Sequence, residues 1–210
     1  MEFSYTLLLI TVTVIISFYA HDRPAVKSKL LFRPYEIKNN KAEIHRFISH
    51  AFIHAHLIHL VMNMMVLYWF GSLLEIVFKA RYGSVGLYYY LLLYFGGAVF
   101  SSIYSYVKHK DNIMYSSLGA SGATMALVFS YVALAPTAPM GLAFMPALHL
   151  PSIIFGLLLL AAEYYMERRG NSGIAHDAHI FGALYGFGFT LLIDIENWRN
   201  FISQIKNAFQ

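Results

Sequence analysis

Charged residues are absent from long stretches of the chain, and these stretches decide its fold class. They cover residues 3–21, 47–74, 82–107, 112–162 and 170–193, the last interrupted only by Asp177. A helix that crosses a bilayer needs about 20 mostly apolar residues, so the 112–162 stretch has room for two. Four prolines within it predict a turn between the two: Pro136, Pro139, Pro146 and Pro151. The pattern therefore predicts six membrane-spanning helices.

The six predicted helices form one all-α domain, a polytopic membrane bundle that covers residues 1–195. We place the spans at about 3–20, 54–77, 83–106, 118–136, 148–166 and 174–194. The first resembles a signal peptide, but it starts with Met-Glu instead of Lys or Arg, and Phe18-Tyr19-Ala20 is a poor cleavage site. We therefore expect it to be retained as a helix.

Two segments outside the spans have patterns of their own. Residues 21–46 combine Pro24, Pro34 and charges with several apolar side chains, which predicts a loop that rests on the membrane. In residues 196–210, apolar side chains recur at helical spacing on the side opposite Arg199 and Lys206. These are Trp198, Phe201, Ile202, Ile205 and Phe209. The tail is predicted to be an amphipathic helix at the membrane interface.

Composition agrees with a membrane environment and excludes several classes of protein. Of the 210 residues, 58% are hydrophobic and 12% are charged, whereas a typical globular chain carries about 25% charged residues. The absence of cysteine excludes a disulfide scaffold and thiol chemistry. A net charge of +4, scattered along the chain, does not favour a nucleic acid as partner. Ten histidines are the unusual feature, since a lipid-facing chain has little use for imidazoles.

Polar side chains within the predicted spans gather in three clusters, although a polar group in a membrane bundle must be paired, hydrated or functional. The clusters are the histidine-rich residues 45–63, Gly119-Ala120-Ser121-Gly122 and His176-Asp177-Ala178-His179. They lie near the starts of the second, fourth and sixth spans, which run in one direction through the bilayer. This topology brings four side chains toward one membrane face: His59, Asn63, Ser121 and His179. A serine, an imidazole and further donors are the parts of a nucleophilic site.

Each cluster also has a structural interpretation. Small residues such as those at 119–122 let transmembrane helices pack closely. Ala178, Gly182 and Gly186 form a similar stripe that would bring the sixth span against the fourth. His179 equally suits a hydrogen bond between helices.

The histidines also raise the alternative of a metal site. His56, His59 and Asn63 lie within roughly 60° of one another on a helix. His179 is the obvious further ligand, but no carboxylate or thiol lies at ligand spacing. His50, His54 and His56 suit either hydration or loop anchoring at the mouth of a water-filled cavity. The others are expected at span ends or in loops, where the interface solvates them: His21, His45, His109, His149 and His176.

Three motifs in order give the chain a specific resemblance. His59-Leu-Val-Met-Asn63 stands in the second span, Gly119-Ala120-Ser121-Gly122 in the fourth and Ala178-His179-Ile-Phe-Gly182 in the sixth. With them the chain resembles the rhomboid intramembrane serine proteases of the compact six-span type. Further matching positions are Arg46, His50, His54, Phe70-Gly71 and Glu75.

The resemblance implies a serine endopeptidase that cleaves transmembrane segments of other membrane proteins in a lipid environment, without a cofactor or metal. Ser121 is the implied nucleophile and His179 the implied base. His59 and Asn63, with the Ser121 N–H, stabilise the oxyanion, and Gly119 and Ala120 complete the oxyanion and substrate-binding set. No third carboxylate is evident, because Asp177 lies about 200° around the helix from His179. The site is therefore expected to be a Ser-His dyad.

Two positions depart from the family pattern. His45 stands where an aromatic residue commonly precedes the arginine, and Met125 stands where many members have a tyrosine that packs on the catalytic imidazole. Methionine supplies an apolar, polarizable contact, so we expect a more loosely oriented His179 and a functional site. The alternatives are a proteolytically inactive membrane-protein binder on the same scaffold and a histidine-rich, metal-dependent membrane protein.

The resemblance also implies a multi-pass protein of the cell membrane, plasma or inner, with its site on the extracytoplasmic face. Eleven of the fifteen Lys and Arg lie on that face, and the positive-inside rule alone would place it in the cytoplasm. We follow the family, because seven of the eleven lie in the 21–46 segment, which its own apolar residues can anchor.

Overall fold

The structure, a computed structural model, describes residues 3–141, 149–170 and 175–208, and a helix lies at each of the six predicted spans. These are α1 (Tyr5–His21), α5 (Leu57–Val66) continued by the π-helical turn η3 (Leu67–Gly71) and α6 (Ser72–Tyr82), α7 (Ser84–His109), α8 (Ser121–Leu134), α9 (Ser152–Arg169) and α10 (His176–Leu192). The predicted all-α class is confirmed. One small addition is an antiparallel hairpin in the proline-rich turn, formed by β1 (Pro139–Gly141) and β2 (His149–Pro151). Pro146 lies outside the described residues.

The 21–46 segment, expected as a loop, folds into short helices. These are α2 (Pro24–Leu30), α3 (Pro34–Asn39) and the 3₁₀ turn η1 (Lys41–His45), followed by α4 (Arg46–Ser49). Pro24 and Pro34 each begin a helix, at the position where the missing N–H of proline has no intrahelical role. The buried Arg46 guanidinium contacts the carboxylates of Glu36 and Glu43 at 2.7 and 2.6 Å. It also donates to two main-chain carbonyls at the end of α2. The Arg46 side chain therefore ties α2, α3 and η1 to α4.

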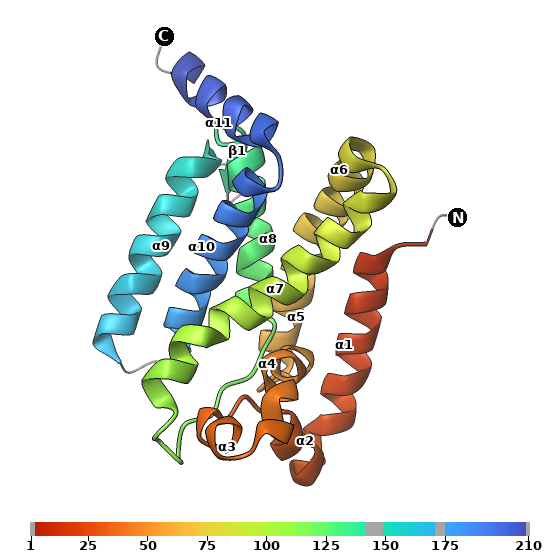
Figure 1. Cartoon of the computed structure of the whole chain (residues 1–210), viewed down its shortest axis with the longest axis vertical. Coiled ribbons are helices and arrows are strands. Elements are labelled where there is room, and N and C mark those ends of the chain that lie inside the picture. Colours follow the sequence, from red (N-terminus) through yellow and green to blue (C-terminus); the bar gives the residue numbers. More distant parts are fainter. Residues whose placement is uncertain (1–2, 142–148, 171–174, 209–210) are drawn as a thin grey trace.

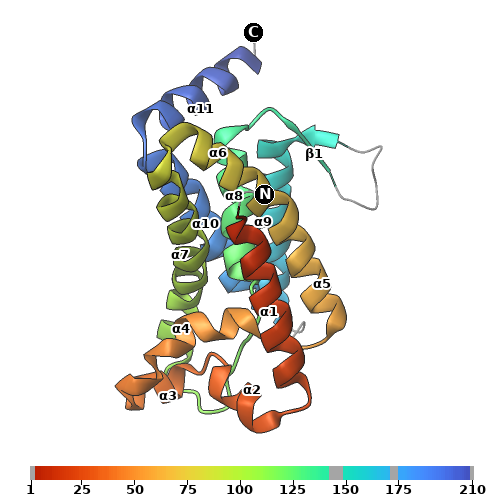
Figure 2. The same cartoon turned by 90° about the vertical axis from the view of Figure 1, so that its right-hand side faces the viewer.

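The helices α5–α6, α8 and α10 run in the same direction, as the sequence predicts for the second, fourth and sixth helices (Figure 1). The start of each faces the end of the bundle where α2, α3 and α4 gather (Figures 1 and 2). Each ends toward the opposite side, where the hairpin and α11 (Ile195–Ala208) lie. The starts of these three spans therefore meet at one end of the molecule.

Helix α8 is short and central. By length and composition, two described helices are long and apolar enough to cross a membrane alone, Leu57–Tyr82 and Ser84–His109. A third helix is long enough only if α10 and α11, whose axes are bent by 107° relative to each other, are taken as one span. The 14 residues of α8 rise about 21 Å, less than the hydrocarbon core of about 30 Å. Most of its side chains are buried against other helices, so α8 lies within protein instead of lipid.

The tail is helical, as predicted, and turns sharply away from α10. Its Phe201 packs on Phe187 of α10 with ring centroids 5.4 Å apart, and Gln204 donates to the carbonyl of Leu134 at 3.0 Å. Phe209, predicted in the apolar stripe, lies outside the described residues. The interfacial position of this helix stays a prediction.

Backbone contact between α8 and α10 confirms the role of the small residues. A Cβ atom on Gly182 would lie 2.2 Å from the carbonyl oxygen of Gly122, and one on Gly186 would lie 2.0 Å from that of Ala126. Real Cβ atoms essentially never approach within 3.0 Å of such an atom. Any larger residue at these two positions therefore forces the helices apart.

Gly186→Ala is expected to lower the free energy of unfolding by about 1–3 kcal/mol, because the new methyl group overlaps the Ala126 carbonyl. Gly188→Ala is the matched control on the same helix, since a Cβ there meets no atom within 4 Å. Alanine at this control site favours the helix by up to about 1 kcal/mol. Thermal unfolding of the purified variants in detergent measures both changes. Equal melting temperatures for the two variants would contradict the close contact.

Candidate active site

Ser121 is the first residue of α8 and follows a backbone turn that requires glycine. Gly119 has a φ of +114°, in the region that L side chains rarely adopt. A Cβ at this position would also lie 2.6 Å from Cε1 of His59. The N–H groups of the first helical turn have no intrahelical partner. The positive end of the helix dipole is therefore located at the Ser121 side chain.

The buried His54 holds the turn that precedes Ser121. Its Nε2 accepts from the N–H of Ala120 at 3.4 Å, which leaves the ring proton on Nδ1. That Nδ1–H donates to Ser17 Oγ on α1 at 2.9 Å, and the Ser17 hydroxyl donates to the carbonyl of Phe52. His54 therefore serves as a loop anchor, one of the two roles that the sequence leaves open.

The buried His50 anchors the same turn from another side. Its carbonyl accepts from the N–H of Gly119 at 2.9 Å, and its Nε2 contacts Ser102 Oγ on α7 at 3.0 Å. The N–H groups of Gly119 and Ala120 are thus both used in holding the turn. The structure gives these two members of the predicted binding set a positional role, since their N–H groups are already bonded.

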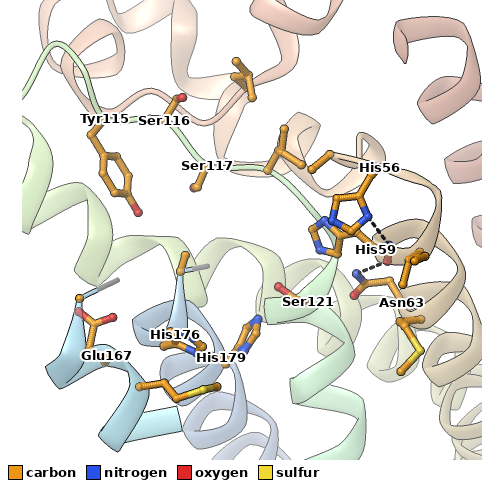
Figure 3. Close-up of a pocket in the computed structure, with 18 of the residues that line it drawn as sticks. His56, His59, Asn63, Tyr115, Ser116, Ser117, Ser121, Glu167, His176 and His179 are labelled. Carbon is orange, nitrogen blue, oxygen red and sulfur yellow. Dashed lines mark hydrogen bonds between the residues drawn. The ribbon is translucent and has the colours of Figure 1, made fainter. Parts of the chain in front are cut away.

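The predicted nucleophile, base and side-chain donors line one cavity of about 1130 Å³. These residues are Ser121, His179, His59 and Asn63. Figure 3 shows Ser121 on α8 between His179 of α10 and the two residues of α5, with the His179 ring turned toward the serine. Three segments far apart in the sequence thus contribute to one site.

His59 and Asn63 stand one turn apart on α5. His56 caps this helix, because its Nδ1 accepts from the N–H of His59 at 3.2 Å. The Asn63 amide donates to the His59 carbonyl at 2.9 Å and accepts from Thr124 Oγ1 at 3.2 Å. An amide nitrogen carries two hydrogens, so Asn63 keeps one N–H for a ligand in the cavity.

A carboxylate that the sequence reasoning missed lies beside His179. The Oε2 atom of Glu163, buried on α9, is 3.0 Å from Nδ1 of His179 and 2.5 Å from Nδ1 of His176. The expectation of no carboxylate near His179 is therefore wrong. So is the expectation of a solvated His176, whose exposed fraction is 1%. Asp177, as expected, turns elsewhere and accepts from Ser105 Oγ.

One signal identifies Glu163 in the sequence. Position 163 falls inside the predicted span 148–166. A carboxylate inside a span is costly unless it has a partner or a function. The charge-free stretches end just before this residue, so a search of those stretches alone omits it.

The cluster of Glu163, His176 and His179 meets the simplest requirement of a metal site within the described residues, since its ligand atoms lie within 4.8 Å of one another. Ligands of a tetrahedral zinc at about 2.0 Å stand about 3.3 Å apart. The 2.5 Å between Glu163 Oε2 and His176 Nδ1 is closer than that and corresponds to a direct hydrogen bond. The geometry favours a hydrogen-bonded cluster over a metal centre. In the other predicted metal set, His56 Nδ1 is already used as a helix cap.

Burial lowers the pKa of His50, in the turn η2 (His50–Phe52) outside the spans, to about 4 from an ordinary value of 6.5. Between these two pH values the unfolded chain binds a proton at this residue and the folded protein does not, so stability falls as the pH falls. The full effect is about 3 kcal/mol. We expect the melting temperature to decrease from pH 6.5 to pH 4, with a shallower slope in His50→Gln.

His45→Gln is the control for this experiment, because His45 is exposed and its ring contacts only main-chain carbonyls among the hydrogen bonds described. Its melting temperature should follow the slope of the parent. An unchanged slope in His50→Gln would contradict the neutral, buried state of His50.

Comparison with known proteins agrees with this arrangement. Residues 41–194, which include α5 through α10, match the rhomboid domain. RHOMBOID-like protein 12, mitochondrial, from Arabidopsis thaliana is 30% identical over 155 residues, 67% of this chain and 44% of that protein. Presenilin-associated rhomboid-like protein A, mitochondrial, from Danio rerio is 33% identical over 137 residues, 65% of this chain and 34% of that protein. The chain spans less than half the length of these relatives. The chain belongs to the rhomboid family and is a polytopic helical membrane protein.

Proposed function

We propose that the chain is a serine-type endopeptidase that cleaves transmembrane segments of other membrane proteins. One observation carries the proposal: Ser121, at the N-terminus of α8, lies beside His179 in a cavity that His59 and Asn63 also line. A hydroxyl, a neighbouring imidazole and further donors are the nucleophile, the base and the oxyanion stabilisers of acyl transfer. Membership of a family that includes serine proteases supports the same activity.

The roles define the proposed reaction. His179 accepts the proton of Ser121 Oγ as that oxygen attacks the substrate carbonyl carbon, and a tetrahedral intermediate forms. The imidazolium gives its proton to the leaving amine, the peptide C–N bond breaks, and an acyl ester of Ser121 remains. A water molecule, deprotonated by the same imidazole, then hydrolyses the ester and restores the serine.

The negative oxygen of the intermediate requires preorganised donors. In the proposal, the free Asn63 N–H and the His59 ring supply them from α5, and the backbone N–H of Ser121 supplies one from α8. The positive end of the α8 dipole acts on the same oxygen. The N–H groups of Gly119 and Ala120 act indirectly, by fixing the turn through His50 and His54.

The proposed substrate is a membrane-embedded helix, and membrane lipid is the surrounding solvent. The cavity walls carry apolar side chains on both sides: Met62 and Val66 on α5 and Met166 on α9. A helix hides its carbonyls in i to i−4 hydrogen bonds, so the cleaved segment must contain helix-weakening residues. The polar side chains of the cavity supply the hydrated surroundings that hydrolysis requires.

A fluorophosphonate probe that modifies activated serines tests the proposal directly. The parent protein should be labelled, and both Ser121→Ala and His179→Ala should lose labelling, because one lacks the nucleophile and the other the base. Asn63→Ala keeps both groups and loses one oxyanion donor, so turnover of a transmembrane substrate should fall about 10²–10³-fold without vanishing. An unlabelled parent would favour the inactive binder, and activity lost to chelators would favour a metal enzyme.

We further propose that the protein lies in the cell membrane with the cavity open to the extracytoplasmic side. The two relatives, by contrast, are named as mitochondrial proteins. Because the chain has no cysteine, single cysteines provide a clean test of orientation. Asn39→Cys in α3 should react with an impermeant maleimide in intact cells, whereas Ser203→Cys in α11, at the opposite end of the bundle, should react only after lysis. The reverse result would overturn the orientation.

A further inference from the structure

We infer that Glu163 is a positioning residue that orients His179 from its Nδ1 side, so that the site is a Ser121–His179–Glu163 triad braced by His176. This inference rests on the proposed function and adds a member to the site. It also replaces the dyad expected from the sequence.

The first step is the position of the carboxylate. Glu163 Oε2 lies 3.0 Å from His179 Nδ1, and the Glu163 residue is only 8% exposed. His179 Nδ1 is itself buried, and it has no aligned hydrogen bond within the described part of the chain. The carboxylate is therefore the acceptor within reach of this buried ring nitrogen. The 3.0 Å separation is within hydrogen-bonding reach, and catalytic hydrogen bonds are often poorly aligned in enzymes without substrate.

The second step is the brace. His176 Nδ1 lies 2.5 Å from the same Oε2 atom, and His176 is buried as well. This hydrogen bond favours the orientation of the Glu163 carboxylate in which Oε2 lies beside both rings. A buried carboxylate without such partners would be costly in a membrane bundle. The cluster therefore has one oxygen that lies between two imidazoles and is hydrogen-bonded to one of them, and the other imidazole belongs to the proposed base.

The third step is the tautomer. A carboxylate at Nδ1 favours the ring form that carries its proton on Nδ1 and leaves the Nε2 lone pair free. Only that form can accept the Ser121 proton through Nε2. When the imidazolium forms, it lies beside a negative carboxylate, which stabilises the charged intermediate.

The contact with Glu163 also explains how His179 can be oriented although position 125 is a methionine and not a tyrosine. Met125 packs in an apolar cluster with Ala183 and Phe187 of α10, and its thioether offers no hydrogen bond that would fix the ring. Glu163 orients the imidazole from α9 instead. The looser His179 expected from Met125 is thus compensated by a contact from another helix.

Turnover of a transmembrane substrate by the full-length protein in detergent tests the inference. Glu163→Gln should lower kcat by at least about 100-fold with little change in KM, since the carboxylate acts on the base and not on the substrate. Glu163→Asp should lose less kcat than Glu163→Gln, because it keeps a carboxylate. The shorter side chain places that carboxylate farther from His179, so kcat should stay below that of the parent. His176→Asn should lower kcat about tenfold, the effect of losing one hydrogen bond to a charged group.

Glu167→Gln is the matched control on the same helix. Glu167 stands one turn after Glu163 and pairs with Lys108 at 2.6 Å. Its loss should change kcat within about threefold. Melting temperatures of all variants exclude misfolding as the cause, and an equal loss of kcat in Glu167→Gln would overturn a specific role for Glu163.

A second readout is independent of turnover. In protein labelled with ¹⁵N-histidine, the His179 signals are assigned by their loss in His179→Ala. They should show a protonated Nδ1 and an unprotonated Nε2, and the Nδ1 proton should move upfield in Glu163→Gln. A proton on Nε2 in the parent would overturn the inference.

The two proposals fail in different ways. If the parent cleaves its substrate, Ser121→Ala does not, and Glu163→Gln matches the parent, the protease assignment stands and the positioning role is wrong. If the parent neither cleaves nor reacts with the serine probe, the protease assignment is wrong, and the His179 tautomer alone decides whether Glu163 orients the ring.

Discussion

The site depends on the backbone contact between α8 and α10. Gly182 and Gly186 let α10 approach the carbonyls of Gly122 and Ala126, where any side chain would collide. Helix α7 approaches α8 by the same means, since a Cβ on Gly97 would lie 2.6 Å from that of Ala126. With neighbours this close, α8 can be too short to span lipid and still be enclosed. Its polar first turn then faces a cavity inside the protein, next to an imidazole on α10.

The burial of α8 among other helices imposes a second constraint. Polar groups inside a membrane bundle need hydrogen-bond or ionic partners. Glu75, a carboxylate in the second span, accepts from the N–H groups of Tyr5 and Thr6 and so caps the start of α1. Thr190 of α10 donates to Ser130 of α8 at 2.7 Å. These bonds fix helices against one another, so the position of the cavity follows from polar pairing as well as from apolar packing.

The sequence predicted the parts of this structure that follow from local pattern. Charge-free stretches located a helix at each of the six predicted positions, and the alternating direction of these helices brought Ser121, His179, His59 and Asn63 to one end, where they line the same cavity. Glu163 was missed because its partner is set by how α9 packs on α10. No periodicity along either helix encodes that contact. The short helices of residues 21–46 were missed for a related reason: their stability comes from the Arg46 ion pairs across the segment rather than from an apolar stripe.

The histidines of this region fall into two groups according to the residues that their rings contact. His50 and His54 contact hydroxyl and main-chain groups. Neither ring is hydrogen-bonded to a carboxylate in the described part of the chain, so each anchors a turn as a neutral imidazole. His176 and His179 lie beside the Glu163 carboxylate, whose Oε2 atom is 2.5 and 3.0 Å from their Nδ1 atoms. The same side chain thus serves as a fixed anchor beside α1 and α7 and, in the proposed mechanism, as the base between α9 and α10. Composition alone could not separate these two roles, because the difference lies in one carboxylate brought from another helix.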